Sequence, residues 1–375
     1  MIEFKDRRHR DIHQPWAEWS EEQTLHLIIP YMNPWRWRTR RELTNEAILH
    51  FRDAPNIRLH VVEIAFGDRP FEVTVPEDID SLQLRTQDEI WHKENAINLM
   101  IARLPPDWKY AGYVDGDMHF TRYNWGLESI HLLQHYDFIQ LFNSFTDLTA
   151  PTATSWMGHR PYRHSSSFAW NFTHPKEFLE SRKRQIAEAQ KGNKVSTATY
   201  YYPPKAYKPG EEPKVFPFGF WPGAPGGAWA WRRSGFQVIN QLLDTCILGS
   251  GDYHMAVGLA GLPDVHQEMQ LEIPGYCCAI TEWRKHAARL NGNIGCLDNY
   301  AIHFWHGNKV HRGYGERPAI LRDHSFDPYA DIKKDWQGLW QWAGNKPGLR
   351  VDTRRFFLSR NEDDVQLIDA KFPLV

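Results

Sequence analysis

The fold is decided by one short stretch, residues 110–117, which reads Tyr110-Ala-Gly-Tyr-Val-Asp-Gly-Asp117. Its first five residues are apolar or small, as in a buried strand, and they run directly into two aspartates separated by a glycine. Apolar runs predict further strands at residues 24–30, 58–65 and 82–85, and helical spacing predicts helices at 38–52 and 88–103. Strands that alternate with helices indicate an α/β fold, with a mixed, mostly parallel sheet flanked by helices.

The rest of the chain divides into a large domain, an insertion and an extension. We expect one α/β domain over residues 1–321 and a C-terminal extension of short helices over residues 322–375, packed on that domain. Residues 157–218 contain few aliphatic side chains and the aromatic triplet Tyr200-Tyr-Tyr202. This segment predicts an inserted lid or acceptor-binding segment, partly helical near residues 175–191, because long loops in compact domains usually bind ligands or are disordered.

Composition argues against a membrane protein and against a strongly basic nucleic-acid binder. The 375 residues carry a net charge of −2, so no global field draws the protein to anionic lipid or nucleic acid. No apolar run approaches the roughly 20 residues that span a bilayer, and the first ten residues lack a signal-peptide core. The four cysteines show no metal-ligand spacing. We therefore expect a cytoplasmic protein with no membrane partner and no obligate protein partner.

Asp115 and Asp117 form the first candidate site. In parallel sheets, ligands bind at the carboxyl ends of the strands, where both aspartates are expected. Carboxylates at positions i and i+2 can converge on one Mg²⁺ or Mn²⁺ ion, since these cations prefer oxygen ligands. Such an ion could hold a nucleotide diphosphate. The alternative is a solvated turn without a metal.

Two histidines form the second candidate site, in the stretch Ala301-Ile-His-Phe-Trp-His-Gly307. His303 and His306 could both face a metal, or one could ligate while the other packs. A buried, hydrogen-bonded pair is the structural alternative. Arg312 follows closely and could hold phosphate oxygens, or pair with a surface acid.

A glycine-rich pair of stretches forms the third candidate site, residues 226–236 and 249–255. Glycine neighbours let the backbone around Asp252 approach a ligand closely. Asp252 could then act as the base that deprotonates an acceptor hydroxyl. The alternative is a helix cap at the helix expected to start near Tyr253.

In this order, the three clusters resemble the GT-A class of nucleotide-sugar transferases. The chain is most similar to a bacterial and phage family that is distantly similar to the β-1,4-galactosyltransferases and the chondroitin-type transferases. The resemblance covers roughly residues 24–120 and 218–364, and it implies Mn²⁺ or Mg²⁺ held by Asp115, Asp117 and His306, with His303 as second choice. Where the galactosyltransferases carry further acids, this chain has Tyr253 and His254. Their acceptor sugar is therefore not carried over.

The resemblance also implies a donor site along the strand ends. The first strand supplies the nucleotide-facing turn, the second an acid near the nucleoside, and the following helix a basic residue near the diphosphate. Together with the clusters above, the candidate donor-binding residues are Pro30, Tyr31, Arg38, Glu63, Lys93, Asn98, Asp115, Gly227 and Arg312.

The predicted function is metal-dependent, inverting transfer of a sugar from a nucleoside diphosphate sugar, UDP by analogy, with Asp252 as the base. The phage branch of the family resembles enzymes that glycosylate 5-hydroxymethylpyrimidines in DNA, so 5-hydroxymethylcytosine in phage DNA is the leading acceptor. Basic clusters at residues 36–41, 160–163 and 182–184 could contact phosphates, although they could equally be solvated surface. The expected location is the cytoplasm of a bacterial or phage-infected cell.

Three alternatives remain open at this point. The acceptor could be a saccharide or surface glycan. The chain could be a non-catalytic sugar-binding protein on a degenerate transferase fold, since its 17 Trp and 15 Tyr suit stacking on sugars as well as core packing. A metal-dependent phosphoester hydrolase would use similar ligands, but it would normally need more carboxylates for two metals.

Overall fold

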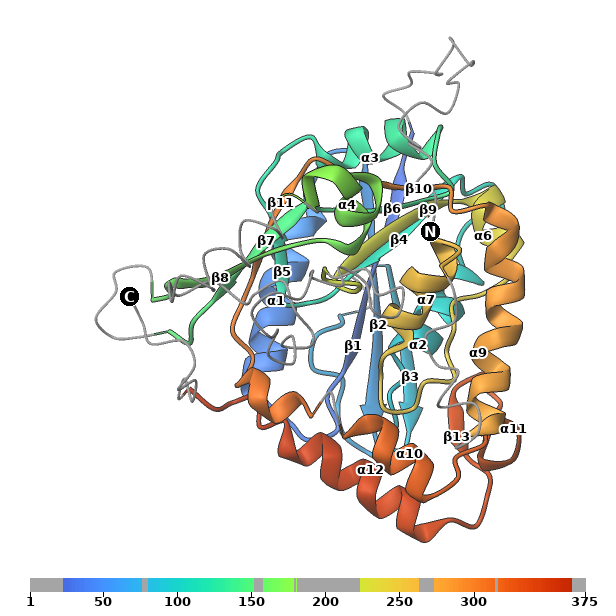
Figure 1. Ribbon diagram of the computed structural model, residues 1–375. Helices are drawn as coiled ribbons and strands as arrows, with labels where there is room; N and C mark the ends of the chain where they lie inside the picture. Colours follow the sequence, from blue (N-terminus) through green and yellow to red (C-terminus); the bar gives the residue numbers. More distant parts are fainter. Residues whose placement is uncertain are drawn as a thin grey trace, which may run out of the picture.

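The computed structural model describes residues 23–75, 80–151, 158–178, 180, 223–262, 273–313 and 316–365. Its centre is a seven-stranded sheet with the order β10-β6-β9-β4-β1-β2-β3 (Figure 1). The strands are β1 Leu25–Met32, β2 Ile57–Phe66, β3 Asp80–Thr86, β4 Tyr110–Val114, β6 Phe138–Gln140, β9 Ala228–Arg232 and β10 Ile294–Cys296. Neighbours from β3 to β4 are parallel, β10 is parallel to β6, and β9 is antiparallel to both its neighbours. The predicted α/β fold with a mixed, largely parallel sheet is therefore confirmed.

Helices cover both faces of this sheet (Figure 1). Along β1, Leu27 and Ile29 pack into one core while Ile28 and Met32 pack into the other, as the two-residue repeat of a strand requires. The first core also contains α1 (Arg38–Arg52) and α3 (Trp125–Leu133). The second contains α2 (Lys93–Ile101), α6 (Arg233–Ile239), α7 (Gly251–Leu259) and α9 (Pro274–Ala287).

The strand order reverses between β1 and β4, and in α/β sheets ligands bind at the carboxyl ends of the strands at such a point. β1 pairs with β4 only from Leu25 to Ile28, but with β2 along its whole length. Its last four residues therefore extend beyond β4. Pro30, which has no N–H to donate, lies in this overhang.

A second, four-stranded sheet with the order β5-β11-β7-β8 begins immediately after Asp117. Its strands are β5 Met118–Phe120, β11 Tyr300–His303, β7 Ser144–Leu148 and β8 Pro161–Ser166. β8 and the following helix α4 (Phe168–Thr173) belong to the segment predicted as an insertion, yet α4 packs on β6 and β10. Residues 175–178 are helical, and the Tyr200–Tyr202 triplet lies outside the described residues.

The C-terminal segment contains a β-hairpin as well as helices. Its elements are α10 Arg317–Asp323, α11 Pro328–Asp331, β12 Ile332–Lys334, β13 Trp340–Trp342 and α12 Pro347–Ser359. The hairpin β12–β13 was not predicted. After α12, Asp363 accepts hydrogen bonds from the backbone N–H groups of Arg38 (3.0 Å) and Thr39 (2.8 Å). The end of the chain thereby caps α1, which carries no acid in its own first turn.

Short 3₁₀ helices follow α9 (Ala288–Leu290) and precede α10 (Lys309–Arg312). Across the part of the chain that the structure describes, no helix has the length and apolar character needed to cross a bilayer. All four cysteines are free thiols.

A pair of buried histidines near the amino ends of β1 and β2 should make stability depend on pH. His26 Nδ1 lies 2.9 Å from His60 Nε2, and burial together with His26 lowers the pKa of His60 to about 4. As the pH falls below 6.5, the unfolded chain takes up a proton that folded His60 does not. The stability contributed by neutral His60 is therefore complete above pH 6.5 and lost as the pH falls towards 4, by up to about 1.4 kcal/mol per pH unit.

We expect His60→Gln to reduce the slope of unfolding free energy against pH between pH 7 and 5, measured by urea unfolding. His286 is exposed, so His286→Gln is the matched control and should keep the wild-type slope. An identical slope in the wild type and in His60→Gln would contradict this account.

Candidate metal centre

Asp115 and Asp117 lie in a tight turn between β4 and β5, at the carboxyl end of β4. The Asp115 N–H donates to the carbonyl oxygen of Gly227 (2.8 Å), and the Met118 N–H donates to that of Asp115 (3.2 Å). A Cβ on Gly116 would lie 2.6 Å from Thr44 Oγ1 on α1, so the residue between the aspartates has to be small. The predicted position of both aspartates at a strand end is confirmed.

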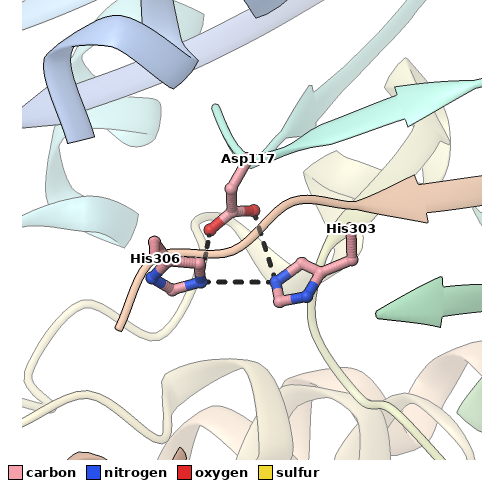
Figure 2. A group of neighbouring side chains, drawn as sticks. All are labelled: Asp117, His303 and His306. Carbon is pink, nitrogen blue, oxygen red and sulfur yellow. Dashed lines mark hydrogen bonds and ion pairs between the residues drawn. The ribbon is translucent and has the colours of Figure 1, made fainter. Parts of the chain in front are cut away.

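Asp117, His303 and His306 point toward one another (Figure 2). Asp117 Oδ2 lies 2.8 Å from His306 Nε2, Asp117 Oδ1 lies 3.7 Å from His303 Nε2, and the two Nε2 atoms are 3.3 Å apart. One ligand atom from each residue lies within 4.8 Å of the other two, so the group could hold a metal ion. Both histidines contribute equally to this group, whereas the sequence favoured His306.

The two polar contacts of His306 Nε2 require this nitrogen to be a hydrogen-bond donor and an acceptor at the same time. This single nitrogen lies 2.8 Å from an Asp117 oxygen, which needs a donor, and 2.7 Å from Arg312 Nη2, which can only donate. No single tautomer serves both contacts. A divalent cation would accept the nitrogen lone pair and the carboxylate charge together. Carboxylate oxygen is a ligand that suits Mn²⁺ and Mg²⁺, whereas imidazole nitrogen favours first-row transition-metal ions over Mg²⁺.

His306 has the protonation state that metal binding requires. Burial, followed by the charge of Arg312, lowers the pKa of His306 to about 4, so the ring is neutral at pH 7. Burial opposes ionisation of Asp117, but His306, His303 and Arg312 hold its pKa well below the usual value. The group therefore offers one carboxylate and neutral imidazole.

Asp115 has a different partner from Asp117. Its Oδ1 lies 2.5 Å from Nζ of Lys93, the first residue of α2, which is buried over the ring of Tyr113. Burial opposes the charge on Lys93, but the Asp115 carboxylate keeps the pKa of this lysine well above the ordinary value. Lys93, predicted to lie near the diphosphate, is thus beside the aspartate turn. Asp115, predicted as a metal ligand, pairs with Lys93 and is not part of the group formed by Asp117, His303 and His306.

Asp252 reaches the same region through the two glycines that precede β9. Its carboxylate lies against Gly226, which has no room for a Cβ, and Gly227 in turn accepts the hydrogen bond from Asp115. Gly227 has φ +89°, and a Cβ there would lie 2.6 Å from Met118 Sδ. Asp252 lies in the first turn of α7, where its Oδ1 accepts from its neighbour Tyr253 N–H (2.9 Å). The N-cap residue of α7 is Ser250, so Asp252 does not have the capping position that the alternative predicted.

Several predicted donor-binding residues have roles inside the fold. Glu63 is 1% exposed, and its carboxylate accepts the backbone N–H groups of residues 72–74 as well as the Thr74 hydroxyl. The amide of Asn98 bonds the backbone of Leu242 in both directions (2.8 and 3.0 Å). These two side chains hold loops and are not free to contact a nucleotide.

Tyr31 and Arg38, at the ends of β1 and α1, differ in exposure. The Tyr31 hydroxyl is buried and donates to Glu72 (2.6 Å). Arg38 is exposed and lies 3.6 Å from Glu42. The less exposed arginine of this stretch is Arg40, which is partly buried, donates to the Met32 carbonyl oxygen (3.1 Å) and pairs with Glu362 (2.5 Å).

Two buried acids next to the histidines were not predicted from the sequence. Asp147 on β7 lies 2.6 Å from His303 Nδ1, and Glu362, which follows α12, lies 3.9 Å from His306 Nδ1. Burial opposes ionisation of both acids. However, Lys309 and His303 hold the pKa of Asp147 well below its usual range, and Arg40 with Arg360 lowers that of Glu362 to about 2.

A pocket of about 560 Å³ lies at the carboxyl ends of β2 and β3. It is lined by Arg36, Phe66, Gly67, Asp68, Arg69, Pro70, Gln87 and Glu89. Arg36 comes from the segment between β1 and α1, so the pocket opens on the same edge of the sheet as the aspartate turn.

No model of a known protein family and no curated protein matches the chain.

Proposed function

We propose that the protein is a metal-dependent glycosyltransferase of the GT-A class that transfers a sugar from a nucleoside diphosphate sugar, UDP-linked by analogy, to an acceptor hydroxyl. The observation that carries the proposal is the Asp117, His303 and His306 group at the carboxyl end of β4. This is the edge at which ligands bind in largely parallel sheets. A metal site built there with a neighbouring lysine and arginine suits a diphosphate.

In this proposal the cation is Mn²⁺ or Mg²⁺, held by Asp117 and the two histidines, and when bound it neutralises charge on the departing diphosphate. Lys93 and Arg312 supply further positive charge beside it, since their cationic groups already contact Asp115 and His306. The pocket beside Arg36 and Phe66 has room for the nucleoside.

Asp252 is the proposed base. It removes the proton from the acceptor hydroxyl while that oxygen bonds to the anomeric carbon and the bond to the diphosphate breaks, which inverts the configuration. Its charge acts on Lys93, Glu94 and Asp115, so it belongs to the same electrostatic cluster as the aspartate turn.

The proposed acceptor is 5-hydroxymethylcytosine in DNA. Within the basic clusters expected to contact phosphates, the partly buried Arg40 and Arg163 form ion pairs with the buried acids Glu362 and Asp147. Arg36, Arg38 and Arg160 are exposed. A saccharide acceptor is the alternative outcome of the test below.

The test is a thermal-shift screen of sugar nucleotides, each with Mn²⁺ and with EDTA. A donor present at 100 times its Kd stabilises the native state by about 2.7 kcal/mol, so one class of donor should raise Tm in Mn²⁺ only. No shift with any donor would contradict the proposal.

The successful donor is then incubated with hydroxymethylated DNA and with saccharides. Transfer to DNA should weaken steeply with salt if the exposed arginines contact phosphates. Donor binding without transfer to any acceptor would favour a sugar-binding protein, and cleavage of phosphoesters would favour a hydrolase.

A further inference from the structure

The carboxylate of Asp147 is buried beside the candidate metal centre, and its two oxygens accept hydrogen bonds from different partners. Oδ1 accepts from His303 Nδ1 at 2.6 Å. Oδ2 accepts from Arg163 Nε at 2.6 Å and from Lys309 Nζ at 2.5 Å. Only 1% of the Asp147 side chain is exposed. Two cations on one oxygen already compensate the buried charge, and the other oxygen is kept for the histidine.

The strand register of the second sheet builds this arrangement. β7 lies between β11 and β8, and Asp147 is paired with His303 on one side and with Arg163 on the other. Residues paired across neighbouring strands place their side chains on the same face of the sheet. His303, Asp147 and Arg163 therefore form a row across three strands, and Lys309 reaches the row from the 3₁₀ helix that follows the histidines.

The bond between Asp147 and His303 determines which ring nitrogen carries the proton. A carboxylate can only accept, so the proton of neutral His303 lies on Nδ1. The lone pair is then on Nε2, which is the atom that faces Asp117 and His306. A carboxylate behind a metal-binding histidine fixes its tautomer and ring orientation and raises its basicity.

We propose that Asp147 is a positioning residue of the metal centre: it holds His303 as the Nδ1–H tautomer with Nε2 directed at the cation, and Arg163 and Lys309 hold Asp147 in place. The inference rests on the metal centre of the proposed function but not on the sugar or the acceptor. According to this inference, metal affinity depends also on Asp147 on β7, Arg163 on β8 and Lys309 in the segment after His306.

The main test compares Mn²⁺ affinity, measured by titration calorimetry, in the wild type and in Asp147→Asn. An amide is a neutral and weaker acceptor, and it can turn its NH₂ group toward the ring, which favours the wrong tautomer. We expect binding to weaken about 10- to 100-fold, the usual effect of losing such a partner. The matched control is Asp244→Asn, because Asp244 is also 1% exposed and pairs with a lysine, Lys334, at 2.7 Å. This control should keep the wild-type Mn²⁺ affinity even where it lowers stability.

A second measurement needs neither metal nor activity. In ¹⁵N-histidine NMR spectra of the metal-free wild type, with the His303 signals assigned by their loss in His303→Gln, the proton should be on Nδ1. A proton on Nε2, or equal Mn²⁺ affinity in the wild type and Asp147→Asn, overturns the inference. A wild type that binds no Mn²⁺ but shows the Nδ1–H tautomer overturns the metal centre instead, so the two failures are distinguishable. If Asp147→Asn does not fold, the tautomer measurement decides.

Discussion

Asp117→Asn should weaken Mn²⁺ binding by about 100-fold or more. Losing a residue that only hydrogen-bonds a metal ligand usually weakens binding by about 10- to 100-fold, and Asp117 is itself a proposed ligand. Asp117 is the one carboxylate in the group, so its replacement leaves two imidazoles beside Arg312 and no negative charge to hold the cation. Since diphosphate binding depends on the ion, the Mn²⁺-dependent Tm shift by the donor should disappear with it.

Titration calorimetry with Mn²⁺ and the thermal shift with donor both measure this effect. Asp80→Asn is the control, because Asp80 pairs with Arg58 at the amino end of β3, away from the strand ends that carry the site. Wild-type Mn²⁺ affinity in a folded Asp117→Asn protein would show that the cation, if any, binds elsewhere.

Asp252→Asn should lower kcat by about 10²- to 10⁴-fold while donor and Mn²⁺ affinities stay near wild type. The amide cannot take a proton from the acceptor hydroxyl. Its oxygen can still accept the hydrogen bond that Asp252 Oδ1 receives from the Tyr253 N–H, so the start of α7 should be preserved. The loss should therefore appear in the rate and not in folding or binding.

Glu94→Gln is the matched control for the base. Glu94 is buried against Gly251, next to Asp252 in the chain, and burial raises the pKa of Glu94 to about 8. The residue is therefore uncharged at pH 7, and an amide of the same shape should change kcat less than tenfold. A wild-type kcat in Asp252→Asn, or an equal loss in both variants, would remove Asp252 from the role of base.

The sequence predicted the parallel half of the central sheet because its elements are long and locally patterned. β1, β2 and α1 carry apolar residues at strand or helix spacing over eight or more residues. The second sheet was not predicted. Its strands have three to six residues, and β8 reads Pro-Tyr-Arg-His-Ser-Ser, with no alternation to recognise. Pairing partners far apart in the chain, rather than local patterns, make these residues strands.

Site residues that belong to a recognisable motif could be predicted from the sequence. Site residues whose role depends on hydrogen bonds formed in the folded structure could not. Asp117, His303 and His306 were predicted as candidate ligands by residue type and spacing, and the preference for His306 came from the family resemblance. Asp115 was predicted as a ligand as well, but its carboxylate pairs with Lys93. Asp147 was not predicted, because a single acid in a short segment has the sequence pattern of an exposed residue. Its role depends on its cross-strand neighbours His303 and Arg163, which the sequence does not reveal. Glu63 illustrates the reverse case: it was predicted to contact a donor, but its carboxylate accepts backbone N–H groups and a hydroxyl from residues 72–74, which follow β2.

Anomalous diffraction from crystals soaked in Mn²⁺ and UDP most directly tests whether one cation is shared by an aspartate and two histidines. We predict an anomalous peak at coordination distance from Asp117 Oδ, His303 Nε2 and His306 Nε2, with Arg312 moved off His306 and diphosphate oxygens completing the shell. A diphosphate bound without a peak between these three side chains, or a peak elsewhere on the protein, would contradict the account.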